Sequence, residues 1–216
     1  MREGTRGGRR SLKKFAPLSV LEISDLKGKP GGLFRFTKVD RPWVPLRTAE
    51  EMPRAAVAMF LSELVEKILE PEIAHPDVFD ALMRAAHSLE HEEHTVWVHL
   101  AFVVELTDLL GLRPEHVEPN GDGSLGTSTA ARHRCFDLST AEWQNASPMD
   151  DTQLDVETGR IFVRIQGMNI AELRALEIKK SDRIRLLRAH IQYLQLHLSR
   201  SAPIKSWDVL RTILAD

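Results

Sequence analysis

The sequence of 216 residues contains a single cysteine and no apolar run long enough to cross a membrane. One cysteine excludes an internal disulfide and a structural zinc site built from four cysteines. A membrane-spanning helix needs about 20 consecutive apolar residues. The longest nearly uncharged run, residues 95–112, already carries His99, Glu105 and Asp108. The charged first residues are followed by no apolar stretch, so they do not form a secretory signal. The composition therefore predicts a cytoplasmic protein without membrane spans.

Residues 95–112 are predicted to form the central helix of a helical core. Apolar residues cover almost every face of this run, as expected of a helix that is buried among others. Gly111 and Pro114 follow in positions that end a helix. We expect His99 and Glu105 to be satisfied at the edge of this helix and to take no part in catalysis.

The net charge of −2 conceals a strong segregation along the chain. Residues 1–47 hold 12 Lys or Arg against 4 Asp or Glu, residues 48–157 hold 6 against 22, and residues 158–216 hold 11 against 5. A basic amino-terminal region on an acidic body suggests a face that binds a polyanion. The alternatives are chance clustering of solvated charges and a basic terminal tail that contacts nothing.

The amino-terminal region is predicted to contain a basic β-hairpin. Residues 18–23 read as a strand with a bulge and residues 33–39 as a second strand. The glycine-rich residues 27–32 form the turn, and residues 42–45 form an extended connector. Phe34 and Phe36 are assigned to the core, with stacking on nucleic-acid bases as the alternative. Two or three strands are too few to close a barrel.

The remainder of the chain is predicted to be mainly helical. Helices are expected from about Pro53 to Leu69, from His75-Pro76 onwards, and over residues 170–178. Two more are expected, one capped by Ser181 and Asp182 and a last one capped by Ser206. Residues 161–165 read as a short strand, and residues 113–157 as a polar, irregular insert.

Three motifs resemble chemical sites. His87, Glu90 and His91 match the zinc-peptidase pattern H-x-x-E-H on one helical face, but chemistry would also require a third carboxylate ligand and a cleft. Residues 121–126 match G-x-G-x-x-G without the flanking strand and helix that a dinucleotide site needs. Cys135, His133 and His116 offer at most three poorly spaced zinc ligands. These patterns favour a binding protein over an enzyme, with no metal and no cofactor.

Three segments in order resemble the RecO family of DNA repair and recombination-mediator proteins. Arg6-Gly7-Gly8-Arg9-Arg10 followed by residues 17–23 is similar to the family's basic loop and its P-L-x-x-L-E strand. Residues 109–114, LLGLRP, are similar to its L-L-G-x-x-P motif. Residues 196–198 and 204–210 resemble its H-L and L-K-S-x-x-x-L ending. Independent signals that agree in order and spacing make the resemblance specific.

The resemblance implies an amino-terminal OB-fold and a helical carboxy-terminal domain. It implies binding of single- and double-stranded DNA, strand annealing, and loading of RecA together with RecR on DNA coated by single-strand-binding protein, at the nucleoid. It assigns DNA contact to Arg9 and Arg10. Charge alone adds further candidates in the same region: Arg6, Lys13, Lys14, Lys27, Lys29 and Arg35. Arg183, Arg185 and Arg188 are candidates for the acidic tail of single-strand-binding protein, with solvated helix charges as the alternative.

The sequence departs from the family pattern in two ways. It begins near the third strand of the expected OB-fold, so we expect the first two strands to be absent, either because the start codon is wrongly placed or because this form is truncated. Only Cys135 stands where many members carry four zinc-binding cysteines, so we expect no zinc. The predicted fold class is α+β: a partial OB-fold-like β module over residues 1–47, then an α-helical domain over residues 48–216. Two rival functions are a helical metal-dependent hydrolase using His87, Glu90 and His91, and a protein-binding scaffold without DNA binding.

Overall fold

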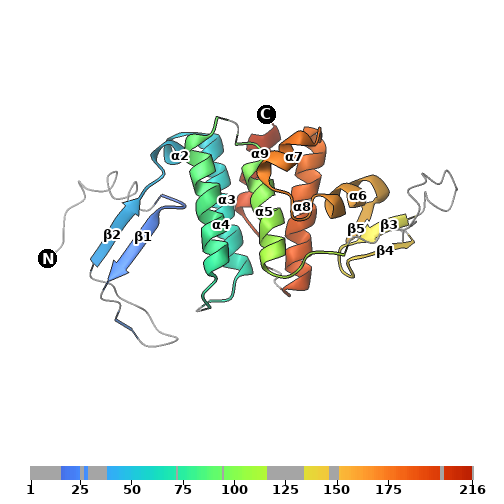
Figure 1. The fold of residues 1–216 in the computed structure, drawn as a ribbon, viewed down its shortest axis with the longest axis horizontal. Helices are drawn as coiled ribbons and strands as arrows, with labels where there is room; N and C mark the ends of the chain where they lie inside the picture. The colour runs from blue at the N-terminus through green and yellow to red at the C-terminus, as the bar shows by residue number, and fades with distance from the viewer. Residues whose placement is uncertain are drawn as a thin grey trace.

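A computed structural model describes residues 16–24, 27–28, 38–71, 73–93, 95–115, 134–145, 151–199 and 202–215. A two-stranded ribbon lies at one end of the molecule, a group of helices in the middle, and a small three-stranded sheet at the other end (Figure 1). The α+β class is therefore confirmed in its general form. No helix among the described residues is long and apolar enough to cross a membrane.

The ribbon consists of β1 (Val20–Ser24) and β2 (Lys38–Trp43), which pair antiparallel. The register shifts between Val20 and Glu22, at the bulge that the broken alternation predicts. The described part of the second strand lies later than expected, because β2 runs on through Pro42 and Trp43, which were assigned to a connector. A proline is tolerated there because, among the described strands, β2 pairs with β1 alone and lies at an edge.

Three prolines mark where helices begin. The short helix α2 (Leu46–Glu50) follows Pro45, and the extended backbone of Glu51 separates it from α3 (Met52–Ile68). Pro53 lies in the first turn of α3, where its missing N–H costs nothing. α4 (Pro76–His91) starts at a proline for the same reason. The predicted starts of both long helices are confirmed.

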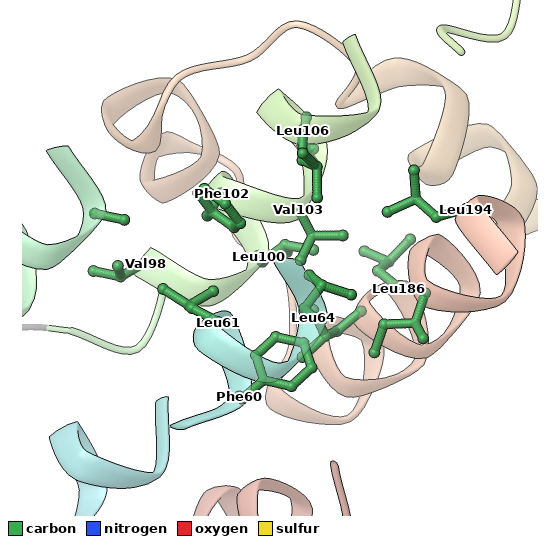
Figure 2. Packing of buried hydrophobic residues seen from close by; sticks show 14 of the residues in the cluster. Phe60, Leu61, Leu64, Val98, Leu100, Phe102, Val103, Leu106, Leu186 and Leu194 are labelled. Carbon is green, nitrogen blue, oxygen red and sulfur yellow. The ribbon is translucent and has the colours of Figure 1, made fainter. Parts of the chain in front are cut away.

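α5 (Val98–Leu109) is the centre of the core, as the sequence predicts. Figure 2 shows its Leu100 and Val103 facing Leu61 and Leu64 of α3 and Leu186 of α8 (Lys180–His197). All five side chains are fully buried. Burying a leucine or valine side chain contributes about 1.5–3 kcal/mol, so each of these five residues stabilises the body substantially.

The region expected to be an irregular insert contains a sheet. Its strands are β3 (Arg134–Asp137), β4 (Glu142–Asn145) and β5 (Gln153–Asp155), in the order β4-β3-β5 and all antiparallel. Phe136 of β3 is fully buried and packs edge-on against Trp143, with ring centroids 5.4 Å apart. Strands of three or four residues are too short to give a clear alternation, so the sequence concealed them.

The predicted strand at residues 161–165 is wrong, because these residues belong to α6 (Val156–Arg164) and the turn that follows it. Asp155 caps this helix by accepting a hydrogen bond from the Thr158 N–H. Gly159 lets α6 pack directly on the sheet, since a Cβ there would lie 2.7 Å from Cβ of Phe136. The β-branched and aromatic residues 161–165 favour a strand locally. The Asp155 cap and the packing of Gly159 on Phe136 stabilise a helix instead.

The carboxy-terminal helices largely follow the prediction. α7 (Ile170–Ala175) starts at a capping box formed by Asn169 and Glu172. α8 begins at Lys180, so Ser181 and Asp182 lie in its first turn and do not cap it. α9 (Ser206–Ala215) begins at the predicted serine.

Candidate functional site

The eight candidate DNA contacts fall in the basic amino-terminal region. Of these residues the structure describes only Lys27, which is exposed. The others lie outside the described residues: Arg6, Arg9, Arg10, Lys13, Lys14, Lys29 and Arg35. The described ribbon adds a further exposed cation, Lys38, whose ammonium lies 3.0 Å from the carboxylate of Asp40.

The three arginines proposed for partner binding point to different places. Arg183 is half-buried and lines a cavity at the start of α8. Arg185 is exposed and forms an ion pair with Asp155. Arg188 is exposed in a groove between α8 and α9, beside Trp207 and Arg211. The structure therefore does not bring the three into one site. Of the three, only Arg183 is half-buried and lines an apolar cavity.

The cavity beside Arg183 has a volume of about 310 Å³ and lies where the ends of four helices meet. Pro53 and Val57 line it from α3, and Ile213 lines it from α9. The segment before α5 contributes Thr95 and Val96. Its remaining lining residues come from α5 and α8: His99, Lys180, Arg183 and Ile184. We call this space the α8 cavity.

The Arg183 guanidinium is held by two contacts that fix its position. Its carbon lies 4.8 Å from the centre of the Trp97 ring, in cation–π geometry. One of its nitrogens donates a hydrogen bond to the Ile178 carbonyl at 3.1 Å. Burial lowers the pKa of Arg183, but an arginine side chain stays protonated in proteins. The remaining donors of the guanidinium are thus presented by a rigid, charged group.

His99 is the unexpected member of the α8 cavity. It was expected at the edge of the central helix, but its side chain is only 2% exposed. Its Nδ1 atom is buried without a hydrogen-bond partner among the described residues. Burial, and next the positive charge of Arg183, lower the pKa of His99 to about 4, so the ring is neutral at pH 7. Glu105, in contrast, lies at the edge as expected and pairs with Arg84 at 2.5 Å.

The composition of the cavity wall determines what it can bind. Its titratable lining groups are Lys180, Arg183 and His99, and none of its described lining residues is a carboxylate. The remaining walls are mostly apolar. A buried cation is stabilised by an opposite charge that shares its low-dielectric surroundings. The wall therefore suits an anion, above all a carboxylate attached to an apolar group.

The H-x-x-E-H motif connects α4 to α2 and to the β1–β2 ribbon. The Glu90 carboxylate accepts hydrogen bonds from the backbone N–H groups of Arg47 and Thr48, both at 2.8 Å, and from the Thr48 hydroxyl at 2.9 Å. It thereby caps the first turn of α2 from a neighbouring helix. The His87 ring packs on Trp43 at 4.7 Å and on His91 at 5.9 Å. These contacts hold the ribbon and α2 on the helical body.

The contacts of Glu90 argue against metal-dependent hydrolysis by this motif. Partial burial acts to raise the pKa of Glu90, but the hydrogen bonds from Thr48 and Arg47 outweigh it and lower the pKa overall. A carboxylate engaged in this way is a poor general base. Among the described residues, no group of three or more His, Cys, Asp or Glu side chains is arranged to hold a metal ion.

Replacing Glu90 by alanine is expected to lower the free energy of unfolding by about 2–3 kcal/mol. The change leaves two part-buried N–H donors of α2 without an acceptor. Hydrogen bonds to a charged group are worth about 1.5–3 kcal/mol. Urea unfolding followed by circular dichroism measures the loss. Glu93→Ala is the matched control, because the Glu93 side chain is 78% exposed and makes a single 3.4 Å contact with Arg47. Equal stability of the two variants would contradict the capping role.

The chain matches the family model described as "Recombination protein O C terminal" over residues 49–208. It is 26% identical to a DNA repair protein RecO of Phocaeicola vulgatus, with 93% of this chain and 79% of that protein covered. It is 26% identical to the RecO of Flavobacterium johnsoniae, with 98% and 83% covered. It is 23% identical to that of Bacteroides fragilis, with 92% and 78% covered. No solved structure matches.

Proposed function

Because this chain belongs to the RecO family, we propose that it is a mediator of DNA repair and homologous recombination that acts without catalysis. It binds single- and double-stranded DNA, anneals complementary strands and assists the loading of RecA with RecR and single-strand-binding protein, at the nucleoid. The observation that carries the proposal is the family match over residues 49–208. The matched RecO relatives add to it, since their similarity extends over more than nine-tenths of this chain.

DNA contact is assigned to the basic module of residues 1–47, which is a partial OB-fold in this proposal. Its excess of lysine and arginine supports this assignment, because phosphate contacts depend on charge more than on exact geometry. The exposed positions of Lys27 and Lys38 are consistent with it. The acidic residues 48–157 repel DNA and thus help to orient it towards the basic module.

Partner contact is assigned to the α8 cavity within residues 48–216. The acidic tail of single-strand-binding protein is the proposed ligand, with Arg183 as its principal contact. The support is chemical: an arginine, a lysine and a histidine share one small space with apolar walls. Arg185 and Arg188 are exposed outside this space. Their part in the proposal is to attract the acidic tail at longer range, a contribution that salt screens.

A salt titration of DNA binding tests the DNA-binding part of the proposal. Each phosphate neutralised on single-stranded DNA contributes about −0.7 to the slope of log K against log salt. Contacts from most of the eight assigned cations therefore predict a slope of roughly −4 to −6. Fluorescence anisotropy of a labelled oligonucleotide at increasing NaCl concentrations measures the slope. Lys27→Ala is expected to make the slope less negative by about 0.7 and to weaken the binding of DNA of any sequence to the same extent.

Two outcomes of this titration would contradict DNA binding by the basic module. One is a slope near zero, and the other is the absence of measurable binding at low salt. If the acidic tail still bound in that case, the protein would be a protein-binding scaffold. Glu93→Ala serves as the control for the lysine variant, since the changed residue is an exposed acid on the helical body.

A further inference from the structure

His99, which lines the α8 cavity, carries a polar atom without a hydrogen-bond partner in the described part of the chain. Nδ1 of His99 is buried and lacks a hydrogen-bond partner among the described residues, whereas most buried polar atoms in folded proteins have one. An unpaired buried polar group costs free energy, about 1–3 kcal/mol in typical cases. Such a group at the wall of a cavity is explained if a ligand supplies the missing partner.

We propose that His99 takes up a proton when an anion enters the α8 cavity and then donates a hydrogen bond to that anion. This rests on the proposed role of the same cavity in holding an acidic tail, and it makes His99 a second binding residue beside Arg183. The proton comes from solvent and binds the unprotonated ring nitrogen. The imidazolium then carries an N–H on both ring nitrogens, and one of them donates to the ligand's oxygen.

The charges around His99 supply the physical reason. The charged side chains that line the cavity with it are Lys180 and Arg183, both from α8. The elements packed on the other sides, α3, α9 and the segment before α5, contribute only neutral lining residues: Pro53, Val57, Thr95, Val96 and Ile213. Empty, the cavity disfavours a third positive charge, which is why burial and Arg183 lower the pKa of His99. A bound carboxylate reverses the sign of the local field and raises this pKa.

Proton uptake makes binding depend on pH in a defined direction. If the bound state holds one proton more than the free state, affinity increases about tenfold for each unit by which the pH falls. The effect levels off once the pH is above the raised pKa of the complex. Ligand carboxylates stay ionised between pH 6 and pH 8, so they do not produce this dependence. Histidine is the only side chain whose ordinary pKa lies in that range.

Isothermal titration calorimetry of the full chain tests the proposal with two probes. One is the N-acetylated carboxy-terminal peptide of the organism's single-strand-binding protein, in which acetylation removes the titrating amino group. The other is 4-methylpentanoate, a simple carboxylate with an apolar tail. Titration at pH 7 in buffers of different ionisation enthalpy gives the number of protons taken up. We expect uptake approaching one proton and an affinity roughly 50- to 100-fold higher at pH 6 than at pH 8.

Matched variants locate the proton. His99→Gln keeps a hydrogen-bonding side chain but cannot titrate, so it is expected to abolish the proton uptake and the pH dependence. His91→Gln changes an exposed histidine outside the cavity and is expected to leave both unchanged. Circular dichroism and unfolding curves confirm that the variants fold.

The two probes separate this proposal from the proposed partner. Peptide binding that depends on Arg183 but shows no proton uptake would overturn the role of His99 and leave the partner assignment standing. Binding of 4-methylpentanoate with proton uptake, but none of the peptide, would support the role of His99 and contradict the partner. Failure of both probes to bind would overturn both proposals.

Discussion

Lowering the pH from 7 to 5 is expected to reduce the free energy of unfolding by about 4 kcal/mol. The cause is two fully buried histidines, His99 and His190, whose pKa values burial lowers to about 4. In the unfolded chain a histidine has a pKa near 6.5, so between these values the unfolded state binds more protons than the folded state. Stability is therefore fully present above about pH 6.5 and is lost progressively as the pH falls towards 4.

His190 illustrates why the folded state keeps such a ring neutral. Its Nδ1 lies 2.7 Å from the Leu186 carbonyl, which can only accept, so Nδ1 carries the hydrogen. Its Nε2 then accepts from the side-chain amide of Gln166 at 2.9 Å. Protonating Nε2 would place two donors face to face in a buried site, packed against Phe162 at 4.3 Å. The cost of that protonated state appears as acid instability.

Urea unfolding at pH 7 and pH 5 measures this loss. Each buried histidine accounts for about 2 kcal/mol of the difference, so His99→Gln is expected to halve it. His91→Gln, which changes an exposed ring, is expected to leave the difference intact. Below about pH 4.5 the carboxylates with lowered pKa, Glu90 and Glu63, add to the loss in the same direction. Stability that is flat between pH 7 and pH 5 would show that the two rings are not held neutral.

Replacing Arg183 by alanine is expected to weaken binding of the acidic tail peptide by about 10- to 150-fold. Hydrogen bonds to a charged partner are worth about 1.5–3 kcal/mol, and each 1.4 kcal/mol corresponds to a tenfold change in affinity. Arg183 is also expected to carry more of the affinity than its neighbours on α8, because its guanidinium is already held over Trp97 and on the Ile178 carbonyl. Preorganised groups lose less entropy on binding.

Two further variants make this prediction specific. Arg183→Lys keeps the charge but loses the planar guanidinium group. Its affinity for the peptide is therefore expected to lie between those of Arg183→Ala and the wild type. Arg185→Ala removes an exposed arginine that pairs with Asp155 outside the cavity, and it is expected to change affinity less than threefold. Calorimetry with the N-acetylated peptide measures all three. Equal losses for Arg183→Ala and Arg185→Ala would point to a diffuse charge effect.

Helices with a strong apolar period were predictable from the sequence, and pairings that depend on distant residues were not. α5 has apolar residues on nearly every face, and Gly111 after it adopts a positive φ of 70° that favours glycine. β3, β4 and β5 are held by the burial of Phe136 against Trp143 and Phe162, which no local pattern announces. The sheet was therefore missed, and the adjoining α6 was assigned to a strand.

Caps supplied by other helices were also hidden. Glu63 of α3 accepts hydrogen bonds from the backbone N–H groups of Lys205 and Ser206, at 3.0 and 2.7 Å, and thus caps α9 from across the body. Glu90 does the same for α2. A cap from a distant glutamate leaves no local signature, whereas Asp155 before α6 is a conventional N-cap. Glu90 of the H-x-x-E-H pattern therefore has a structural role, although the pattern resembles a zinc-binding motif.

Two of the segments that resemble the RecO family have structural reasons for their residues. In LLGLRP the Leu112 carbonyl accepts a hydrogen bond from the Tyr193 hydroxyl at 2.8 Å, and Arg113 donates to the Gln166 carbonyl at 3.1 Å. In the IKSWDVL ending Ser206 is the residue that Glu63 holds. Both segments form hydrogen bonds that connect separate elements of the helical body. They indicate the family but not the proposed partner site, and nothing in them points to His99 or Lys180.

Annealing of complementary oligonucleotides is the most direct test of a recombination mediator that combines DNA contact with partner contact. The rate is measured on bare strands and on strands coated with the organism's single-strand-binding protein. Wild-type protein is predicted to accelerate both reactions, and Arg183→Ala is predicted to match it on bare strands and to lose the acceleration on coated ones. A wild-type protein that leaves the annealing rate of bare strands unchanged would contradict the proposed function.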